Sequence, residues 1–496
     1  MNTEIYMNNI YAYILPDKHI LRRRTAKQNF SFRKAPCMNI KKYIGNRTFY
    51  KSVMALTFPV IVQNGISNFV NLLDNVMVGS LGTEPLSGVA IVNQLIFVYM
   101  LMLFGGISGA GIFTAQFFGR RDDEGVRYTF RFKLYTAVLL TALGMAVIWC
   151  FRDGLISLFL TEDNSGADPA LALMYGKEYI GIALLALIPT ALTQVYASTL
   201  RETEHTVVPM VASVAAVIVN GVFNYVFIFG AFGIPAMGVR GAAIGTIIAR
   251  CTELLIVLLW THLHSGKVPY IKGAYRSFYI PGRLAGQITL KGAPLFFNEL
   301  LWALGMTVMT QCYSTRGLSA VAAVNISSTI SNIFNIFYMS MGTAVAIMVG
   351  SLLGAGKIEE AKDTDRKLIA FSCAVSVGIG IIMASFSHVF TLFYDVSEQV
   401  RQLAVYMMII SSAMMPFNSY VHNCYFTLRS GGQTMITFLF DCVFVWCISV
   451  PTALLLSRCT DLDILPLYAI CVCLDIIKCV IGFFMLRSGK WAKKLV

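Results

Sequence analysis

The chain has 496 residues, of which 56% are hydrophobic and only 13% are charged, whereas a soluble domain carries about 25% charged residues. This composition excludes a soluble globular protein and predicts an integral membrane protein with many spans. The net charge of +13 invites a nucleic-acid-binding interpretation, but the Lys and Arg residues lie in short loops between apolar runs, where they orient membrane helices. We therefore expect no nucleic-acid partner.

The first 37 residues are polar and basic and include the run Arg22-Arg23-Arg24. A second methionine, Met38, begins a basic lead-in to the first apolar segment. Two interpretations stay open: translation starts at Met38, or residues 1–37 form a disordered basic tail. The intact mass of the protein from its native host would distinguish them.

Twelve apolar segments follow, and each is long enough to cross a bilayer, since about 20 apolar residues span the hydrocarbon core. Basic residues concentrate in the loops on one side, with 24 Lys and Arg there and six on the other. By the positive-inside rule both termini are cytoplasmic, and an even number of spans agrees with that orientation. The predicted spans are residues 52–79, 86–118, 132–151, 175–200, 207–231, 238–262, 289–314, 320–352, 366–393, 400–428, 434–456 and 464–486.

The two halves of the chain repeat each other. Because the same helix position recurs six spans later, an even number, the halves share one orientation and form a parallel repeat. The matching stretches are LSGVAIVN (86–93) with LSAVAAVN (318–325), FFG (117–119) with LLG (352–354), and Leu200-Arg201 with Leu428-Arg429.

This repeat predicts an all-α integral membrane protein whose twelve transmembrane helices form two parallel six-helix lobes, an arrangement suited to alternating access. The predicted parts are a basic extension (1–37), an N-lobe with helices 1–6 (38–262), a cytoplasmic linker (263–288) and a C-lobe with helices 7–12 and a basic tail (289–496).

Two acidic residues, Asp74 and Glu299, are the strongest functional candidates. Each half opens with a helix that carries a proline, Pro59 or Pro294, and then one of these acids. A carboxylate within the hydrocarbon costs a few kcal/mol on insertion scales, so it must face a partner, a cavity or an ion. One interpretation is a structural hydrogen bond to a neighbouring helix. We favour ion coupling, through exchange of a proton or binding of Na⁺.

Three neutral side chains accompany Asp74 in this interpretation. Asn220 and Asn224 are one helical turn apart and share a face, and Thr246 lies in the next span. They are expected to supply oxygens beside Asp74, although interhelical hydrogen bonding alone is an equally open interpretation.

Two pairs of opposite charges at i,i+3 spacing, Arg250 with Glu253 and Asp475 with Lys478, can neutralise themselves, so a structural role is favoured. Asp441 lacks an obvious local partner and is a weaker functional candidate.

Methionine is abundant, at 23 residues, and its flexible side chain suits pockets that accept many shapes, although lipid-facing or core positions are the more usual use. Glycines spaced by four, at Gly105/Gly109 and Gly241/Gly245, predict close helix packing. The candidate residues for a substrate cavity or gate are Pro59, Gln63, Asn298, Asn418 and Met415.

No enzyme signature is present: the six His lack ligand spacing, and there is no Walker A sequence or serine nucleophile elbow. We expect no enzymatic activity and no cofactor beyond a coupling ion, with Na⁺ the metal considered at Asp74 or Glu299. Without a nucleotide-binding loop, active transport must be driven by an ion gradient.

These residues give the chain a resemblance to the MATE (multidrug and toxic compound extrusion) family of cation-coupled antiporters, over residues 50–490. The loop GRRDDEGVR does not fit the other twelve-span candidate, the major facilitator fold. The stretches that carry the resemblance are FPVIVQNGISNFVNLLDNVMVGSLG, ALTQVYASTLRETEHT, VNGVFNYVFIFGAFGIPAMGVRGAAIGT, KGAPLFFNELLWALG and PFNSYVHNCYFTLRSGGQT.

The resemblance implies that Asp74 is the N-lobe cation or proton site, with Asn220 and Thr246 around it, and that Glu299 is the C-lobe site that one branch of the family uses. The chain departs from the family twice. Many relatives have an acid at the position of Asn224, and that branch has an acid at the position of Asn418. The coupling ion and its stoichiometry therefore stay open.

The sequence predicts a secondary active multidrug efflux antiporter, monomeric and located in the plasma (inner) membrane. It would export amphipathic, cationic organic compounds in exchange for Na⁺ or H⁺. A flippase for lipid-linked precursors is one alternative, although its cavity should be lined with Arg or Lys, and here Arg250 and Lys478 each lie beside an acid. A channel or sensor is the other, and it predicts no dependence on an imposed ion gradient.

Overall fold

The computed structural model describes residues 42–157, 168–394 and 396–496, and these contain helices and turns without a strand. An all-helical chain is expected for a protein in lipid, because a helix satisfies its own backbone hydrogen bonds where no water is available. The predicted extension 1–37 lies outside the described residues.

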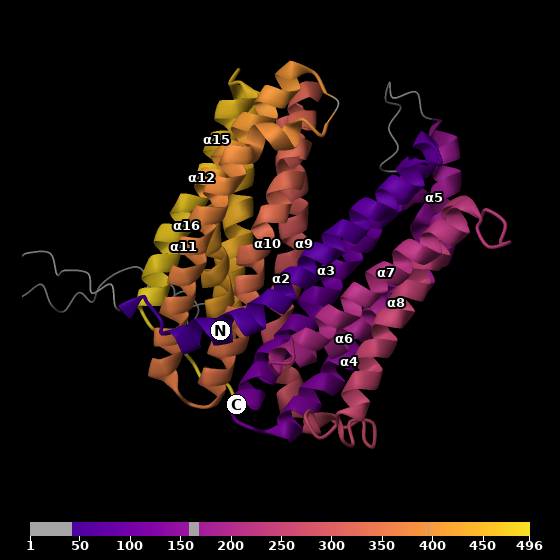
Figure 1. Cartoon of the computed structure of the whole chain (residues 1–496). Coiled ribbons are helices and arrows are strands. Elements are labelled where there is room, and N and C mark those ends of the chain that lie inside the picture. Colours follow the sequence, from indigo (N-terminus) through magenta and orange to yellow (C-terminus); the bar gives the residue numbers. More distant parts are fainter. Residues whose placement is uncertain (1–41, 158–167, 395) are drawn as a thin grey trace, which may run out of the picture. The chain divides into compact units, whose positions relative to one another are not determined.

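The first half supplies six spans, which Figure 1 draws from indigo to magenta. The fourth span consists of two α-helices joined by the 3₁₀ turn η3. The elements are α2 (Arg47–Gly79), α3 (Thr83–Gly119), α4 (Asp123–Ser157), α5 (Pro169–Ala183), η3 (Leu184–Ala186), α6 (Leu187–Glu202), α7 (Val207–Phe229) and α8 (Gly238–Leu263).

The second half supplies six more spans, drawn from salmon to yellow in Figure 1. Its last two spans are irregular: the eleventh contains two π-helical stretches, η5 and η6, and the twelfth is interrupted at Leu474. The elements are α9 (Gly282–Ser314), α10 (Leu318–Gly354), α11 (Ile358–Thr391), α12 (Glu398–Ser430), α13 (Thr434–Phe438), η5 (Leu439–Val443), η6 (Val445–Ser449), α14 (Val450–Cys459), α15 (Ile464–Cys473) and α16 (Asp475–Arg487).

The twelve predicted spans are all present as helices in the described part of the chain. Eleven of them are long and apolar enough by composition to cross a membrane. The remaining span is the seventh, α9, which carries Glu299, and its 33 residues include Arg283 and Lys291. Polar residues therefore make α9 the least lipid-like span.

The predicted linker, residues 263–288, extends too far at its C-terminal end. α8 ends at Leu263 as expected, but α9 already begins at Gly282, after Pro281. The apolar signal begins only near Thr289, because the first two turns of α9 are polar. The linker between the helices is anchored to α4 through Arg131, whose guanidinium donates to the carbonyl oxygens of Gly273, Ala274 and Tyr279.

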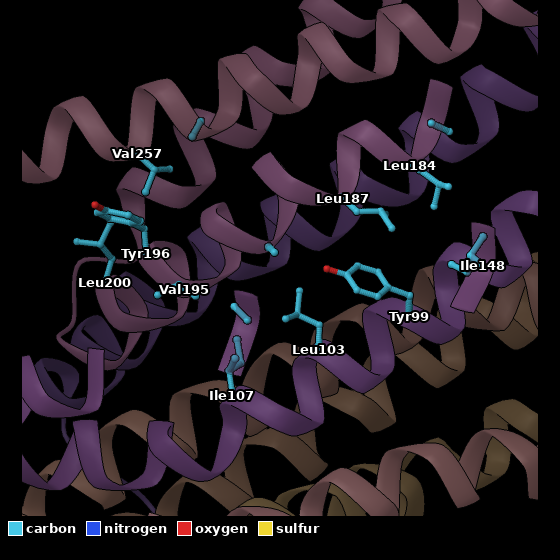
Figure 2. Packing of buried hydrophobic residues seen from close by; sticks show 14 of the residues in the cluster. Tyr99, Leu103, Ile107, Ile148, Leu184, Leu187, Val195, Tyr196, Leu200 and Val257 are labelled. Carbon is cyan, nitrogen blue, oxygen red and sulfur yellow. The ribbon is translucent and has the colours of Figure 1, made fainter. Parts of the chain in front are cut away.

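Each half has its own buried apolar core. In the first half, side chains of α3 pack against those of η3 and α6, and Figure 2 shows Tyr99 and Leu103 beside Leu187. In the second half, one cluster joins α9, α10 and α12. A third cluster includes Val53 of α2 together with residues of α10 and α12, so it connects the two lobes.

The lobes meet where glycines let helix backbones touch. A Cβ atom at Gly119 would lie 1.9 Å from the carbonyl oxygen of Ser351, and one at Gly354 would lie 1.9 Å from that of Gln116. These two glycines end the FFG and LLG stretches of the repeat, so equivalent residues form the α3–α10 crossing.

The predicted close packing at the spaced glycines is confirmed. A Cβ at Gly109 would lie 2.4 Å from the Cα of Gly292 on α9, and one at Gly241 would lie 2.5 Å from the Phe227 backbone on α7.

Candidate functional site

The N-lobe site forms where α2, α7 and α8 meet. Asp74 is half-buried on α2, and its Oδ1 accepts a hydrogen bond of 2.6 Å from the Nδ2 of Asn224. The same amide group donates to the Oδ1 of Asn220 over 3.3 Å. Because the two asparagines are one turn apart on α7, both amides face the aspartate. The structure thus joins by hydrogen bonds three of the residues that the sequence grouped, Asp74, Asn220 and Asn224.

Asn224 has an unused acceptor. Its Oδ1 is buried and has no hydrogen-bond partner among the described residues. Gly245 of α8 leaves the room for this amide, since a Cβ there would lie 2.1 Å from the Oδ1. An unpaired buried acceptor costs free energy, so this oxygen is suited to accept a hydrogen bond or to coordinate a cation.

Two further residues lie near Asp74. Thr246 is half-buried on α8, and its hydroxyl donates to the carbonyl oxygen of Ala242. Tyr179 of α5 is buried, and its hydroxyl interacts with Thr246. The tyrosine lies within electrostatic reach of the Asp74 carboxylate. Sequence reasoning missed Tyr179, because a tyrosine in an apolar helix carries no signal of its own.

A chain of polar contacts lies beside this site and crosses four helices. Arg201 donates to the Oε1 of Gln63 over 3.2 Å, and the Nε2 of Gln63 donates to Ser213 over 3.0 Å. Ser213 donates to Glu253 over 2.7 Å, and Arg250 forms an ion pair of 2.9 Å with the other oxygen of Glu253. The predicted i,i+3 pair is confirmed, and Gln63 is held on both sides of its amide.

The C-lobe site is built on α9 and α12. Glu299 is half-buried, and its Oε1 accepts a hydrogen bond of 3.1 Å from the hydroxyl of Tyr425. The buried Arg429, which follows one turn later on α12, lies within electrostatic reach of Glu299 and packs on the rings of Phe104 and Phe426. Sequence reasoning missed Tyr425, although it lies in a stretch that carries the family resemblance.

Asp441, which lacks an obvious local partner in the sequence, has two partners in the structure. Its Oδ2 accepts from Asn298 over 3.1 Å, and its Oδ1 accepts from Lys478 over 3.1 Å. Lys478 also pairs with Asp475 over 3.6 Å, which confirms the second i,i+3 pair. Both partners of Asp441 are far away in sequence, so no local pattern indicates them.

The other cavity and gate candidates are dispersed. Pro59 is buried within α2, where its missing N–H removes one helix hydrogen bond. Asn418 is half-buried on α12, and its Oδ1 has no partner among the described residues. Met415 is buried against Gly380 of α11, so it belongs to the interior of the C-lobe.

Asp74 and Glu299 do not hold equivalent positions. Glu299 lies five residues after Pro294, and the residue five after Pro59 is Asn64. Asn64 donates to Ser340 of α10 over 3.2 Å, so it contacts the opposite lobe. Asp74 lies three turns further along its helix than Glu299 does.

The MatE family model matches residues 59–226 and 294–455. A probable multidrug resistance protein NorM from Thermotoga maritima is 23% identical over 452 residues, which are 90% of this chain and 94% of that protein. The multidrug resistance protein MdtK from Edwardsiella ictaluri is 25% identical over 421 residues, which are 82% of this chain and 87% of that protein.

Two solved structures share the fold. One is an outward-facing multidrug resistance MATE family transporter of the MOP superfamily, with a TM-score of 0.79 and 18% identity. The other is a MOP superfamily transporter from Pyrococcus furiosus that is described as having a binding pocket of reverse polarity, again with a TM-score of 0.79 and 18% identity. Each comparison covers 92% of this chain and 98% of the other.

Proposed function

The chain belongs to the MatE family of membrane transporters, and we propose that it is a secondary active antiporter that exports amphipathic, cationic organic compounds in exchange for Na⁺ or H⁺. The observation that carries the proposal is the group of Asp74 and Asn224 within apolar helices, where a carboxylate lies beside an unpaired amide oxygen. A carboxylate and neutral oxygens form the kind of site in which secondary transporters hold Na⁺ or a proton.

Alternating access couples the two ligands through the charge of Asp74. In the outward-facing state the external cation binds Asp74, with Asn220, Asn224 and Thr246 as further oxygens. Neutralising the carboxylate lowers the affinity for a cationic substrate, which is released outside. The buried Pro59, which weakens α2, is the position where we place the accompanying bend. The return to the inward-facing state then carries the cation inward.

Glu299 is the second coupling carboxylate in this proposal. It lies in the least apolar span, beside the lobe contact at Gly105, where a Cβ would lie 3.2 Å from the Cγ of Glu299. A charge change at Glu299 therefore acts at the surface between the lobes. Asn418, Asn298, Gln63 and Met415 remain candidates for cavity or gate residues.

The experiment that tests the proposal is efflux of ethidium from proteoliposomes. Na⁺ and pH gradients are imposed separately on the wild type, on Asp74→Asn and on Asp153→Asn, an exposed acid that serves as the matched control. We expect efflux driven by one gradient, lost in Asp74→Asn and kept in Asp153→Asn. Efflux independent of both gradients would contradict antiport and favour the flippase or the channel.

Ion pairing bears on the flippase alternative. Arg250 and Lys478 are each bound to a carboxylate, so neither is free to hold a pyrophosphate group. We further propose a monomer in the plasma (inner) membrane with both termini in the cytoplasm, and no enzymatic activity. A reporter that is active only in the cytoplasm, fused after Val496, tests the orientation of the C-terminal end, and an inactive reporter on a fusion that is present in the membrane would refute it.

A further inference from the structure

The two lobes contain corresponding chains of polar contacts at equivalent positions of the repeat. Gln63 lies four residues after Pro59, and Asn298 lies four residues after Pro294. Each donates its amide hydrogens to the fifth span of its own half, Gln63 to Ser213 and Asn298 to Asp441.

The positions in these fifth spans are equivalent too. Ser213 lies twelve residues after Arg201, and Asp441 lies twelve residues after Arg429, where the two arginines are the repeated helix ends. A serine in one lobe thus corresponds to a carboxylate in the other.

These chains of polar contacts continue into the last span of each half, where the central charged residues have opposite signs. In the N-lobe, Ser213 contacts Glu253, whose counter-ion is Arg250 three residues earlier. In the C-lobe, Asp441 contacts Lys478, whose second counter-ion is Asp475 three residues earlier. An anion is therefore central in one chain and a cation is central in the other.

The Lys478 ammonium has the surroundings of a bound cation. The residue is 5% exposed, and its Nζ lies 3.1 Å from an oxygen of Asp441 and 3.6 Å from one of Asp475. The ring centroid of Phe444 is 5.1 Å away, which adds a cation–π contact. Two carboxylates and an aromatic face enclose this single positive charge.

Both acids lie at irregular points of their helices. Asp441 lies in the π-helical stretch η5, and Asp475 is the first residue of α16 after the interruption at Leu474. Pro451 follows η6, and its missing N–H removes one helix hydrogen bond there. The equivalent spans α7 and α8 are continuous. Discontinuous helices are where secondary transporters place ion sites.

A second observation connects this group to Glu299. Asn298 is 1% exposed, and its Oδ1 has no partner among the described residues. An ionised Asp441 only accepts hydrogen bonds, so it binds the NH₂ end of the Asn298 amide. The unpaired oxygen is then directed away from Asp441. The Nδ2 of Asn298 also lies 3.5 Å from the hydroxyl of Tyr425, which itself donates to Glu299, so Tyr425 connects this amide to the carboxylate.

We propose that Asp441 and Asp475 form a cation site in the C-lobe whose resident cation is the ammonium of Lys478. Through Asp441, this site positions the Asn298 amide against the hydroxyl of Tyr425, which donates to Glu299. If Lys478 occupies this site, Glu299 is the only residue of the C-lobe that exchanges a cation during transport. This consequence rests on the proposed function. The site takes monovalent cations of ammonium size when Lys478 is removed.

The test is chemical rescue of Lys478→Ala, which empties the space of the side chain. Thermal unfolding of the purified full chain is followed with methylammonium chloride and, for ionic strength, with choline chloride. We expect Lys478→Ala to unfold earlier than the wild type, and methylammonium to raise its unfolding temperature by about 2–4 °C more than choline does. Lys478→Met, whose side chain fills the space, is the matched control and should show no such difference.

Equal effects of the two salts on Lys478→Ala, or an equal methylammonium effect on Lys478→Met, would overturn the proposal. If Lys478→Ala cannot be purified, the same titration uses Lys478→Ala with Asp475→Asn, which leaves one carboxylate to bind the amine. Stabilisation by methylammonium over choline is expected there as well, and its absence contradicts the site.

Ethidium efflux separates this inference from the proposed function. If wild-type efflux ignores both ion gradients, antiport fails while the thermal titration still decides about the site. If wild-type efflux is coupled, Lys478→Met should weaken the coupling by roughly tenfold, a loss of about 1.4 kcal/mol. Unchanged coupling in that variant would overturn the positioning of Asn298 by this site.

Discussion

The N-lobe and the C-lobe bury charges of opposite sign at the same place of their common scaffold. Thr199 and Thr427 each directly precede the repeated Leu-Arg helix end. In the N-lobe, Thr199 contacts the buried ammonium of Lys133 on the third span. In the C-lobe, Thr427 contacts the buried carboxylate of Asp365, also on the third span.

The partners of these two buried charges differ as well. Lys133 forms an ion pair with Glu202, whereas Asp365 has no ion pair within the described parts of the chain. The repeat therefore retains the positions at which polar groups are buried, but the sign of the buried charge differs between the two lobes.

The largest effects are expected at the two coupling carboxylates. Asp74→Asn and Glu299→Gln remove one negative charge each without changing side-chain size. If both lobes couple, each variant alone abolishes gradient-driven ethidium efflux, because an uncharged amide exchanges neither a proton nor Na⁺. Full activity of one variant would assign coupling to the other lobe, and full activity of both would refute ion coupling.

The next largest effect is expected at the buried ion pair of the N-lobe. Lys133→Met leaves Glu202 without its counter-ion in a buried site, which costs about 3–5 kcal/mol of folding free energy. Asp365→Asn is the C-lobe counterpart, and it keeps an acceptor for Thr427. A thermal unfolding measurement should therefore show a clearly larger loss for Lys133→Met, and equal losses would contradict the difference between the lobes.

The glycine contact between the lobes is expected to be symmetric. Gly119→Ala and Gly354→Ala each place a Cβ against a backbone oxygen, which cannot yield as a flexible side chain can. Each should cost about 1–3 kcal/mol, and the two should agree because the repeat puts both at one crossing. Gly154→Ala, where nothing lies within 4 Å, is the control and should not lower the unfolding temperature, because alanine is the better helix former.

The smallest effect is expected at an exposed ion pair. Asp153 pairs with Lys177 over 2.9 Å, and its side chain is 61% exposed. Because water screens such a pair, Asp153→Asn should change the folding free energy by less than about 1 kcal/mol. A loss comparable to that of Lys133→Met would contradict the role assigned to burial.

Local patterns in the sequence were sufficient for the spans and for part of the site. The apolar runs predicted all twelve helices, and the repeat predicted the two lobes, since length and hydropathy dictate what crosses a bilayer. Helical spacing placed Asn220 and Asn224 on one face, and the glycine spacing predicted the close helix crossings. All of these follow from hydropathy, spacing or repetition that can be read along the chain.

Contacts between distant helices were decided by the tertiary structure alone. The two partners of Asp441, which are Asn298 and Lys478, come from other spans. Tyr425 likewise donates to Glu299 from another span. A lone polar residue in an apolar run shows that a partner must exist, because burial without one is costly. Which residue fulfils that requirement depends on how the helices pack. Only the folded chain therefore reveals that equivalent positions in the two lobes bury charges of opposite sign.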